Sequence, residues 1–412
     1  MKNIIKLNCL FAFLIIFNAC TDREENVISQ NNNVSYFISK DSAIAISNKA
    51  IAEIANKSET RCVKEDWGLE IKDINLINIS NKPRTRANET NISTSLYIIN
   101  YKDNKGFSII SSDKRLRPIY AVSDTGHIAI TDTITNKSLT NFFNGVRYDI
   151  EESTKNPMLD PYANNETVIY PQVSPLIWLA PRLWGQEEPY NTYCYTKDGK
   201  KALVGCAAVA CGIIMSYYSW PSYIDGQRLN WHGMKKHTVD HNIDFVFGKL
   251  GEKKQLDMNY GVNASGASSA NFSRTFVRMG YNTPDNFKEF SEDNVCKLLE
   301  NNSSAGYGPL LIIGNNTNGK SGHAWVIDGY CKNVISSDGK VVYGTNLFHC
   351  IWGWKGRNNG YFFLNNGVIG GTSHIYDKDD SKTPSNSPKY YTKLYYMSNF
   401  RINRNKQNVN LK

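Results

Sequence analysis

The chain has 412 residues and an ordinary globular composition, with 41% hydrophobic and 21% charged side chains. This length allows two or three domains. The formal net charge is +9, but the basic residues are scattered among acidic ones, so the sequence predicts no nucleic-acid surface.

The first twenty residues have the pattern of a bacterial signal peptide. Lys2 and Lys6 give a positive start, and the apolar run 7–17 is too short to span a bilayer comfortably. The run ends in Phe-Asn-Ala-Cys, which resembles a lipobox with Cys20 as the lipidated residue. Ordinary secretory cleavage nearby is the alternative. Either way we expect export, as an outer-membrane lipoprotein facing the periplasm or the surface, or as a secreted product, with 21–33 as a polar tether.

Residues 34–155 read as a compact α+β unit without a catalytic constellation. A capping pair at Asp41 and Ser42 predicts a helix, and the apolar runs on both sides of Asp-Asn-Lys-Gly predict a hairpin over 95–110. A second helix with regularly spaced apolar residues begins at Ser138.

A break in composition follows at 156–165, NPMLDPYANN, which has two prolines and no periodicity. Such a segment predicts an exposed linker that is easily cut. We assign the linker to 156–172 and a second domain to 173–412.

The second domain opens with a candidate nucleophile. In 202–221, ALVGCAAVACGIIMSYYSWP, Gly205 and Cys206 stand at the head of a buried helix that Pro221 ends. A thiol at a helix N-terminus is favoured as the reactive thiolate. The alternative is that Cys206 is a small buried hydrophobe, like Cys211 in the same helix. From this stretch alone both interpretations stay open.

The pattern then changes from helix to strand. Residues 222–271 are polar and look irregular, and helices are predicted at 273–281 and 291–301. Helices followed by strands give an α+β layout with room for a cleft between the halves. The predicted strands are 309–314, 323–329, 340–344, 347–354 and 360–365.

A thiol nucleophile needs a base, usually a histidine. His323 begins an apolar strand after a small polar lead-in and could project into a cleft; a structural histidine at a strand end is the alternative. Asp328 is an odd number of positions from His323, so strand alternation places the two on opposite faces. We therefore assign Asp328 and Gly329 to a turn, and interpret His349 as structural.

The sequence does not favour a metal, another cofactor or a disulfide framework. The nine cysteines include no C-x-x-C pair, although a pairing of Cys194 with another core cysteine stays open. Three histidines, His232, His237 and His241, are candidates for a metal cluster. They lack the H-E-x-x-H pattern, and the residues between them favour a helix poorly.

Several blocks resemble the streptopain family of bacterial cysteine peptidases. In chain order they are WGQEEPYN (184–191), LVGCAAVACGIIMSYYSWP (203–221), SGHAWVIDGY (321–330) and FHCIWGWKGRNNGYFFLN (348–365). GFSIISSDKRLRPIYAVSDTGH (106–127) resembles the inhibitory propeptide of that family. The resemblance implies an α+β fold: a papain-like two-lobe peptidase, with a helical lobe and a twisted antiparallel sheet lobe, preceded by an α+β prodomain.

The resemblance also assigns roles to residues. Cys206 would be the nucleophile of an endopeptidase acting on proteins or peptides, and His323 the general base that later protonates the leaving amine. Gln186 would line the oxyanion hole and Trp352 would pack over the histidine. The chain's own prodomain would inhibit it until removed, and a lipid on Cys20 would anchor it to a membrane.

One position departs from the family pattern. An asparagine usually precedes the first tryptophan of W-G-W, where its amide could orient the imidazole, and here Ile351 takes that place. The departure keeps a weak or inactive peptidase-like binding lipoprotein as an alternative. A transferase that uses the same Cys-His pair cannot be separated by motif.

Overall fold

The structure is a computed structural model, and the residues it describes all belong to one compact unit, Tyr36–Lys412. The leader, with Cys20, lies outside the described residues. The described ranges are 36–57, 69–79, 95–129, 137–155, 168–173, 183–236, 241–305, 308–316, 322–337, 340–364, 367–369 and 390–411.

The N-terminal part is the α+β domain that the sequence predicts. Its elements are α1 (Lys40–Lys57), β1 (Ile71–Asn78), β2 (Ser95–Tyr101), the short η1 (Lys102–Asn104), β3 (Phe107–Ser111), β4 (Ile119–Ser123) and α2 (Lys137–Lys155). The hairpin forms as predicted, because β2 pairs antiparallel with β3 and the Tyr101 N–H donates to the Gly106 carbonyl. Gly106 is required there, since a Cβ would lie 1.9 Å from the Ser123 carbonyl oxygen.

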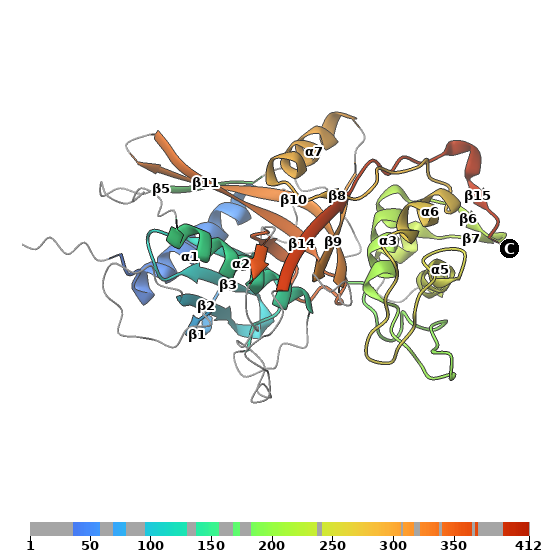
Figure 1. The fold of residues 1–412 in the computed structure, drawn as a ribbon, viewed down its shortest axis with the longest axis horizontal. Coiled ribbons are helices and arrows are strands. Elements are labelled where there is room, and N and C mark those ends of the chain that lie inside the picture. Colours follow the sequence, from blue (N-terminus) through green and yellow to red (C-terminus); the bar gives the residue numbers. More distant parts are fainter. Residues whose placement is uncertain are drawn as a thin grey trace, which may run out of the picture. The chain divides into compact units, whose positions relative to one another are not determined.

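The C-terminal part contains the remaining helices and the two longest strands (Figure 1). Its helices are α3 (Cys206–Tyr218), α4 (Trp231–Lys236), α5 (His241–Gly251), α6 (Asn271–Arg278), α7 (Glu292–Ala305) and η2 (Arg404–Lys406). Its strands are β5 (Val168–Val173), β6 (Tyr223–Ile224), β7 (Gln227–Arg228), β8 (Lys288–Glu289), β9 (Leu310–Asn316), β10 (Gly322–Ser337), β11 (Lys340–Ile351), β12 (Gly360–Phe362), β13 (Gly367–Ile369), β14 (Tyr390–Met397) and β15 (Asn408–Val409).

Three sequence predictions need correction. The region 222–271 is not irregular, because α5 buries Ile243, Val246, Phe247 and Leu250 at helical spacing. The two strands predicted over 340–354 are one continuous strand, β11. The end of the predicted linker is β5, whose backbone pairs with residues 331–336 of β10.

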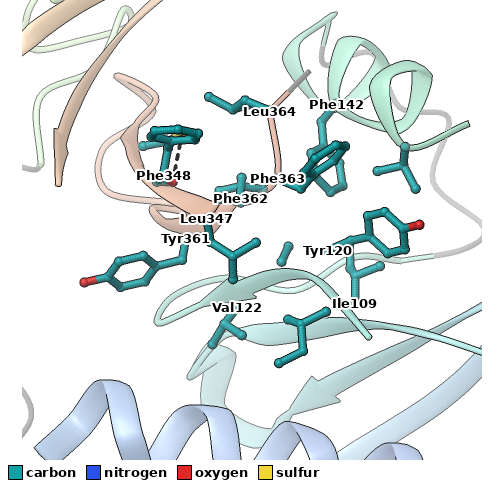
Figure 2. Close-up of a cluster of buried hydrophobic side chains, with 14 of the residues drawn as sticks. Ile109, Tyr120, Val122, Phe142, Leu347, Phe348, Tyr361, Phe362, Phe363 and Leu364 are labelled. Carbon is teal, nitrogen blue, oxygen red and sulfur yellow. Dashed lines mark hydrogen bonds between the residues drawn. The ribbon is translucent and has the colours of Figure 1, made fainter. Parts of the chain in front are cut away.

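One antiparallel sheet joins the two parts of the chain. Among the described strands its order is β1-β2-β3-β4-β12-β11-β10-β9-β14-β13, with β5 on β10 and β8 on β14. The junction is the pairing of β4 with β12, in which Val122 lies opposite Tyr361. Around it, Figure 2 shows Tyr120 and Phe142 beside Phe362 and Phe363, and the rings of Phe142 and Phe362 are 5.3 Å apart. The junction is therefore both hydrogen-bonded and packed with apolar side chains.

Two hydrophobic cores lie on opposite faces of the strands that carry the candidate site. Ala324 and Val326 of β10 belong to a helical core with α3, whereas Trp325 and Ile327 belong to a sheet core shared with the N-terminal domain. This alternation follows from the two-residue repeat of a strand. It decides which side chains of β10 and β11 can reach the candidate active site.

Candidate active site

Cys206 is the first residue of α3, and its position depends on Gly205. Gly205 has a φ of +89°, and a Cβ there would lie 2.2 Å from Met258 Cε. Glycine alone fits this turn without strain. Because the first helical N–H groups have no partner within the helix, the thiol lies at the positive end of the α3 dipole.

Exposure separates Cys206 from the other thiols. None of the six described cysteines is in a disulfide, and of these six Cys206 alone is partly exposed. Burial raises the pKa values of Cys194, Cys211 and Cys350, so these thiols stay protonated at neutral pH. The sequence leaves open a disulfide between Cys194 and another core cysteine, but Cys194 is not in a disulfide.

A backbone hydrogen bond holds Gln186 beside the loop that leads into Cys206, which we call the cysteine loop. Its carbonyl accepts the N–H of Val204, two residues before Cys206, at 2.9 Å. The neighbouring Trp184 is buried against Phe247 of α5, with ring centroids 5.8 Å apart, and its carbonyl accepts the Lys355 N–H at 3.0 Å. The segment that carries Gln186 is thus fixed both to the cysteine loop and to the loop after β11. Sequence position alone does not reveal this arrangement.

His323 is held among tryptophan rings near the start of β10. Its ring stacks on Trp325 with 5.9 Å between centroids, and Trp354 lies at 5.3 Å. Trp352, which the resemblance places over the histidine, lies at 6.2 Å. The imidazole is therefore shielded by three rings, and Trp354 covers it at least as closely as Trp352 does.

The Trp352 carbonyl oxygen is the hydrogen-bond partner of His323. His323 Nε2 lies 3.2 Å from this oxygen. A carbonyl can only accept, so Nε2 carries the proton and Nδ1 keeps its lone pair. That tautomer leaves Nδ1 as the nitrogen that could take a proton from a thiol.

The helix that carries Cys206 and the strand that carries His323 pack against each other. Helix α3 packs on β9 and β10, and a Cβ on Gly353 would touch Val209 of α3 at 2.8 Å. Cys206 packs against the helical core, while His323 stacks on Trp325 of the sheet core. His323 in turn hydrogen-bonds to the Trp352 carbonyl.

Two family models match the chain in the order of these two parts. The model described as Spi protease inhibitor matches residues 35–150, and that described as Peptidase C10 family matches 184–250 and 247–362. Streptopain of Streptococcus pyogenes is 24% identical over 322 residues, which cover 66% of this chain and 74% of streptopain. The chain belongs to the streptopain family of cysteine peptidases.

The chain is also similar to another curated protein and to two solved structures. The thiol protease/hemagglutinin PrtT of Porphyromonas gingivalis is 25% identical over 315 residues, covering 65% of this chain and 34% of PrtT. A fragment of Prevotella intermedia prointerpain A has a TM-score of 0.48 at 17% identity and covers 79% of this chain and 98% of the fragment. Active interpain A of the same organism has a TM-score of 0.35 at 18% identity, covering 58% and 97%.

The family membership confirms the predicted enzyme class and the two-part organisation. This streptopain-family chain is a cysteine peptidase zymogen, because an inhibitor-type prodomain precedes its peptidase domain. The predicted α+β fold is also confirmed, with a helical core that includes α3 and an antiparallel sheet that includes β10.

Asp328 does not form a turn in this peptidase, which corrects the sequence prediction. It lies within β10 at a bulge between Ile327 and Gly329, and its Oδ1 is 2.5 Å from His349 Nδ1. Both side chains are buried, so the pair is structural, as expected for His349. The sequence Asp-Gly suits a bulge as well as a turn, and only the strand register separates the two.

Metal ligation gains no support from the parts of the chain that the structure describes. There, no group of three or more His, Cys, Asp or Glu side chains could hold a metal ion. Of the histidines considered as ligands, His237 lies outside the described residues.

Ile351 is not placed where a side chain could orient the imidazole of this peptidase. It is fully buried in the helical core, on the face opposite Trp352. We expect Ile351→Asn to lower the free energy of unfolding by about 2–4 kcal/mol, because it buries an amide in an apolar core. Urea unfolding of the full chain measures this change, with Ile351→Val as the matched control. An asparagine variant as stable as wild type would show that position 351 does not face the helical core.

Burial lowers the pKa of His323 from its ordinary 6.5 to about 4, while the Trp352 carbonyl partly raises it. Between pH 4 and 6.5 the unfolded chain therefore binds more protons at this residue, so its contribution to stability is complete above pH 6.5 and is lost as the pH falls towards 4. At 1.36 kcal/mol per pH unit, a shift from 6.5 to about 4 makes this contribution at most about 3–4 kcal/mol.

The test compares two full-length chains, Cys206→Ala and Cys206→Ala with His323→Gln, by urea unfolding at pH 7.5 and pH 4.5. We expect the chain that keeps His323 to lose more stability on acidification. Equal losses would contradict a neutral, buried His323.

Proposed function

We propose that this zymogen is an exported cysteine endopeptidase in which Cys206 is the nucleophile and His323 the general base and acid. The observation that carries the proposal is the position of Cys206. It is the partly exposed thiol among the described cysteines, and it stands at the first residue of α3. The helix dipole favours the thiolate, which is the attacking species, and the neutral His323 imidazole would accept the thiol proton.

The reaction would follow the two steps of acyl transfer. His323 Nδ1 takes the thiol proton, and the Cys206 sulfur attacks the peptide carbonyl. The imidazolium then protonates the leaving amine, and an acyl-enzyme remains. In the second step His323 removes a proton from water, and the water oxygen attacks the acyl carbonyl. The C–S bond then breaks, the acid leaves, and the proton on His323 returns to the Cys206 sulfur.

The oxyanion of each tetrahedral intermediate needs preorganised donors. We assign this role to the Gln186 side-chain amide and to the Cys206 backbone N–H, which belongs to the first residue of α3. The backbone contact between Gln186 and Val204 supports the assignment, because it holds the glutamine beside the cysteine loop. Trp352 and Trp354 would shield the imidazole from water.

The prodomain would keep the zymogen latent. In the full chain the imidazole pairs with a carbonyl on the sheet-core side, and the same sheet core includes prodomain residues. We propose that cleavage within 156–172 lets the prodomain leave, which removes its hydrogen bonds to the loop after Trp352 and opens the site to substrate. Because the backbone of β5 is hydrogen-bonded to β10, a cut inside 168–173 is disfavoured.

Export and lipidation are proposed from the leader, whose residues lie outside the described ones. Lipid on Cys20 would anchor the enzyme to a membrane, and no described helix is long and apolar enough to cross one. Mass spectrometry of the N-terminal peptide from the native protein tests this. Cleavage that leaves Cys20 unmodified or removes it would reject the lipid anchor.

The catalytic proposal is tested with the chain from Thr21 onward, produced with its prodomain. The linker is cut with an added protease, the sample is reduced, and casein hydrolysis is followed before and after the cut. We expect hydrolysis only after cutting and reduction, since a reactive thiol is readily oxidised. A correctly cut and reduced chain that leaves casein intact would reject the proposed function.

A further inference from the structure

Asn359 is a buried amide in the loop between β11 and β12 that reaches back to the active-site segment. Its side chain is 2% exposed, and its Oδ1 accepts the backbone N–H of Trp352 at 3.2 Å. Its own N–H donates to the Gly356 carbonyl at 3.4 Å. The loop that follows Trp352 is therefore closed on itself by the backbone and the side chain of a single residue.

Both backbone polar groups of Trp352, its N–H and its carbonyl, are hydrogen-bonded to side chains. Its N–H is bonded to Asn359, and its carbonyl is bonded to His323 Nε2 at 3.2 Å. The next residue, Gly353, has a φ of +76°, and a Cβ there would lie 2.8 Å from Val209. The direction of the Trp352 carbonyl thus depends on two fixed points, the Asn359 bond before it and the glycine turn after it.

We propose that Asn359 is a positioning residue for the peptidase reaction, because it fixes the Trp352 carbonyl that orients the His323 imidazole. The Asn359 amide acts on the backbone of Trp352 and not on the imidazole ring. The inference rests on the proposed role of His323 as general base.

The backbone carbonyl of Asn359 also accepts hydrogen bonds from the prodomain. Ser123 Oγ donates to the Asn359 carbonyl at 2.6 Å, the Asp124 N–H donates to it at 3.3 Å, and Thr125 Oγ1 donates to the Gly356 carbonyl at 2.7 Å. These bonds are lost when the prodomain leaves. The side-chain bond from Asn359 to Trp352 remains, because both partners belong to the peptidase domain. Its effect is therefore measured on the cut enzyme.

The experiment compares wild type, Asn359→Ala, Asn359→Asp and the loop control Arg357→Ala, each produced as the full chain and cut at the linker. A peptide substrate gives kcat and KM, and thermal unfolding gives Tm. Aspartate keeps the acceptor oxygen and alanine removes it. Arg357 is exposed and lies two residues away in the same loop.

We expect Asn359→Ala to lower kcat roughly 10- to 100-fold with KM within about threefold of wild type, because a misaligned base slows the chemical step and leaves substrate binding intact. Asn359→Asp should recover most of kcat, and Arg357→Ala should match wild type. If alanine unfolds the chain, Asn359→Ser replaces it, since serine is too short to reach the Trp352 N–H.

Three results would overturn the inference: an alanine variant with wild-type kcat, a loss confined to KM, or an aspartate variant as slow as alanine with the same Tm. An inactive wild type would instead reject the proposed function, so the two failures are distinguishable.

Discussion

Replacing Cys206 with alanine is expected to abolish casein hydrolysis, with a loss of about 10⁴-fold or more in kcat for the cut and reduced enzyme. The variant keeps the fold, because alanine suits a helix start and Cys206 is only partly buried. The loss follows from chemistry alone: without sulfur no acyl-enzyme can form. Hydrolysis of a fluorogenic peptide over several hours measures the residual rate.

Cys211→Ala is the matched control for this variant. It removes a thiol from the same helix, but this thiol is fully buried and its pKa is raised by that burial. We expect wild-type turnover with a modest loss of stability. If Cys211→Ala were inactive and Cys206→Ala active, the nucleophile would be misassigned.

The second large effect is expected at Gln186. Gln186→Ala should lower kcat by roughly 10²- to 10³-fold with little change in KM, because an oxyanion donor acts mainly on the transition state. Gln186→Glu is the sharper variant, since it keeps the size of the side chain and replaces the donor with a negative charge. We expect it to be at least as slow as alanine in the same peptide assay.

Glu187→Gln provides the control for Gln186, because Glu187 is exposed and its side chain pairs with Lys355 Nζ at 3.2 Å. It should retain nearly full activity. If Gln186→Ala changed KM and left kcat intact, the glutamine would contribute to substrate binding and not to the oxyanion hole.

Most of the fold could be predicted because local patterns agree with the tertiary structure. The hairpin over 95–110 has an unambiguous turn, and the α3 stretch is apolar on all sides, as a buried helix must be. The sequence does not predict α5, because polar residues surround its short apolar stripe. The strand β5 could not be predicted, since its pairing with β10 depends on contacts between residues far apart in the sequence.

The candidate site could be predicted only where side-chain identity carries the chemistry. Cys206 and His323 are such residues, and family motifs point to both. The Trp352 carbonyl is a backbone group that every residue has, so no sequence pattern marks it as the partner of His323. The bond from Asn359 to Trp352 and the pairing of Asp328 with His349 likewise depend on loop closure and strand register.

Latency in the full chain has a physical basis in the sheet junction. Strand β4 of the prodomain continues the sheet at β12, and Phe362 contacts Phe142 of the prodomain, with 5.3 Å between ring centroids (Figure 2). Phe362 also contacts Trp352, with 5.1 Å between ring centroids. We therefore expect removal of the prodomain to change the packing around Trp352. We propose this as the link between the activation cut and the geometry of the imidazole.

The most direct test of a Cys206–His323 peptidase held latent by its prodomain is the rate of irreversible labelling by a peptidyl chloromethyl ketone, measured before and after the linker is cut. Peptide mapping then identifies the modified cysteine. We predict slow labelling of the full chain and fast labelling of the cut chain at Cys206, faster than free cysteine reacts. Labelling of the cut chain at the rate of free cysteine, or at another cysteine, would contradict the assignment.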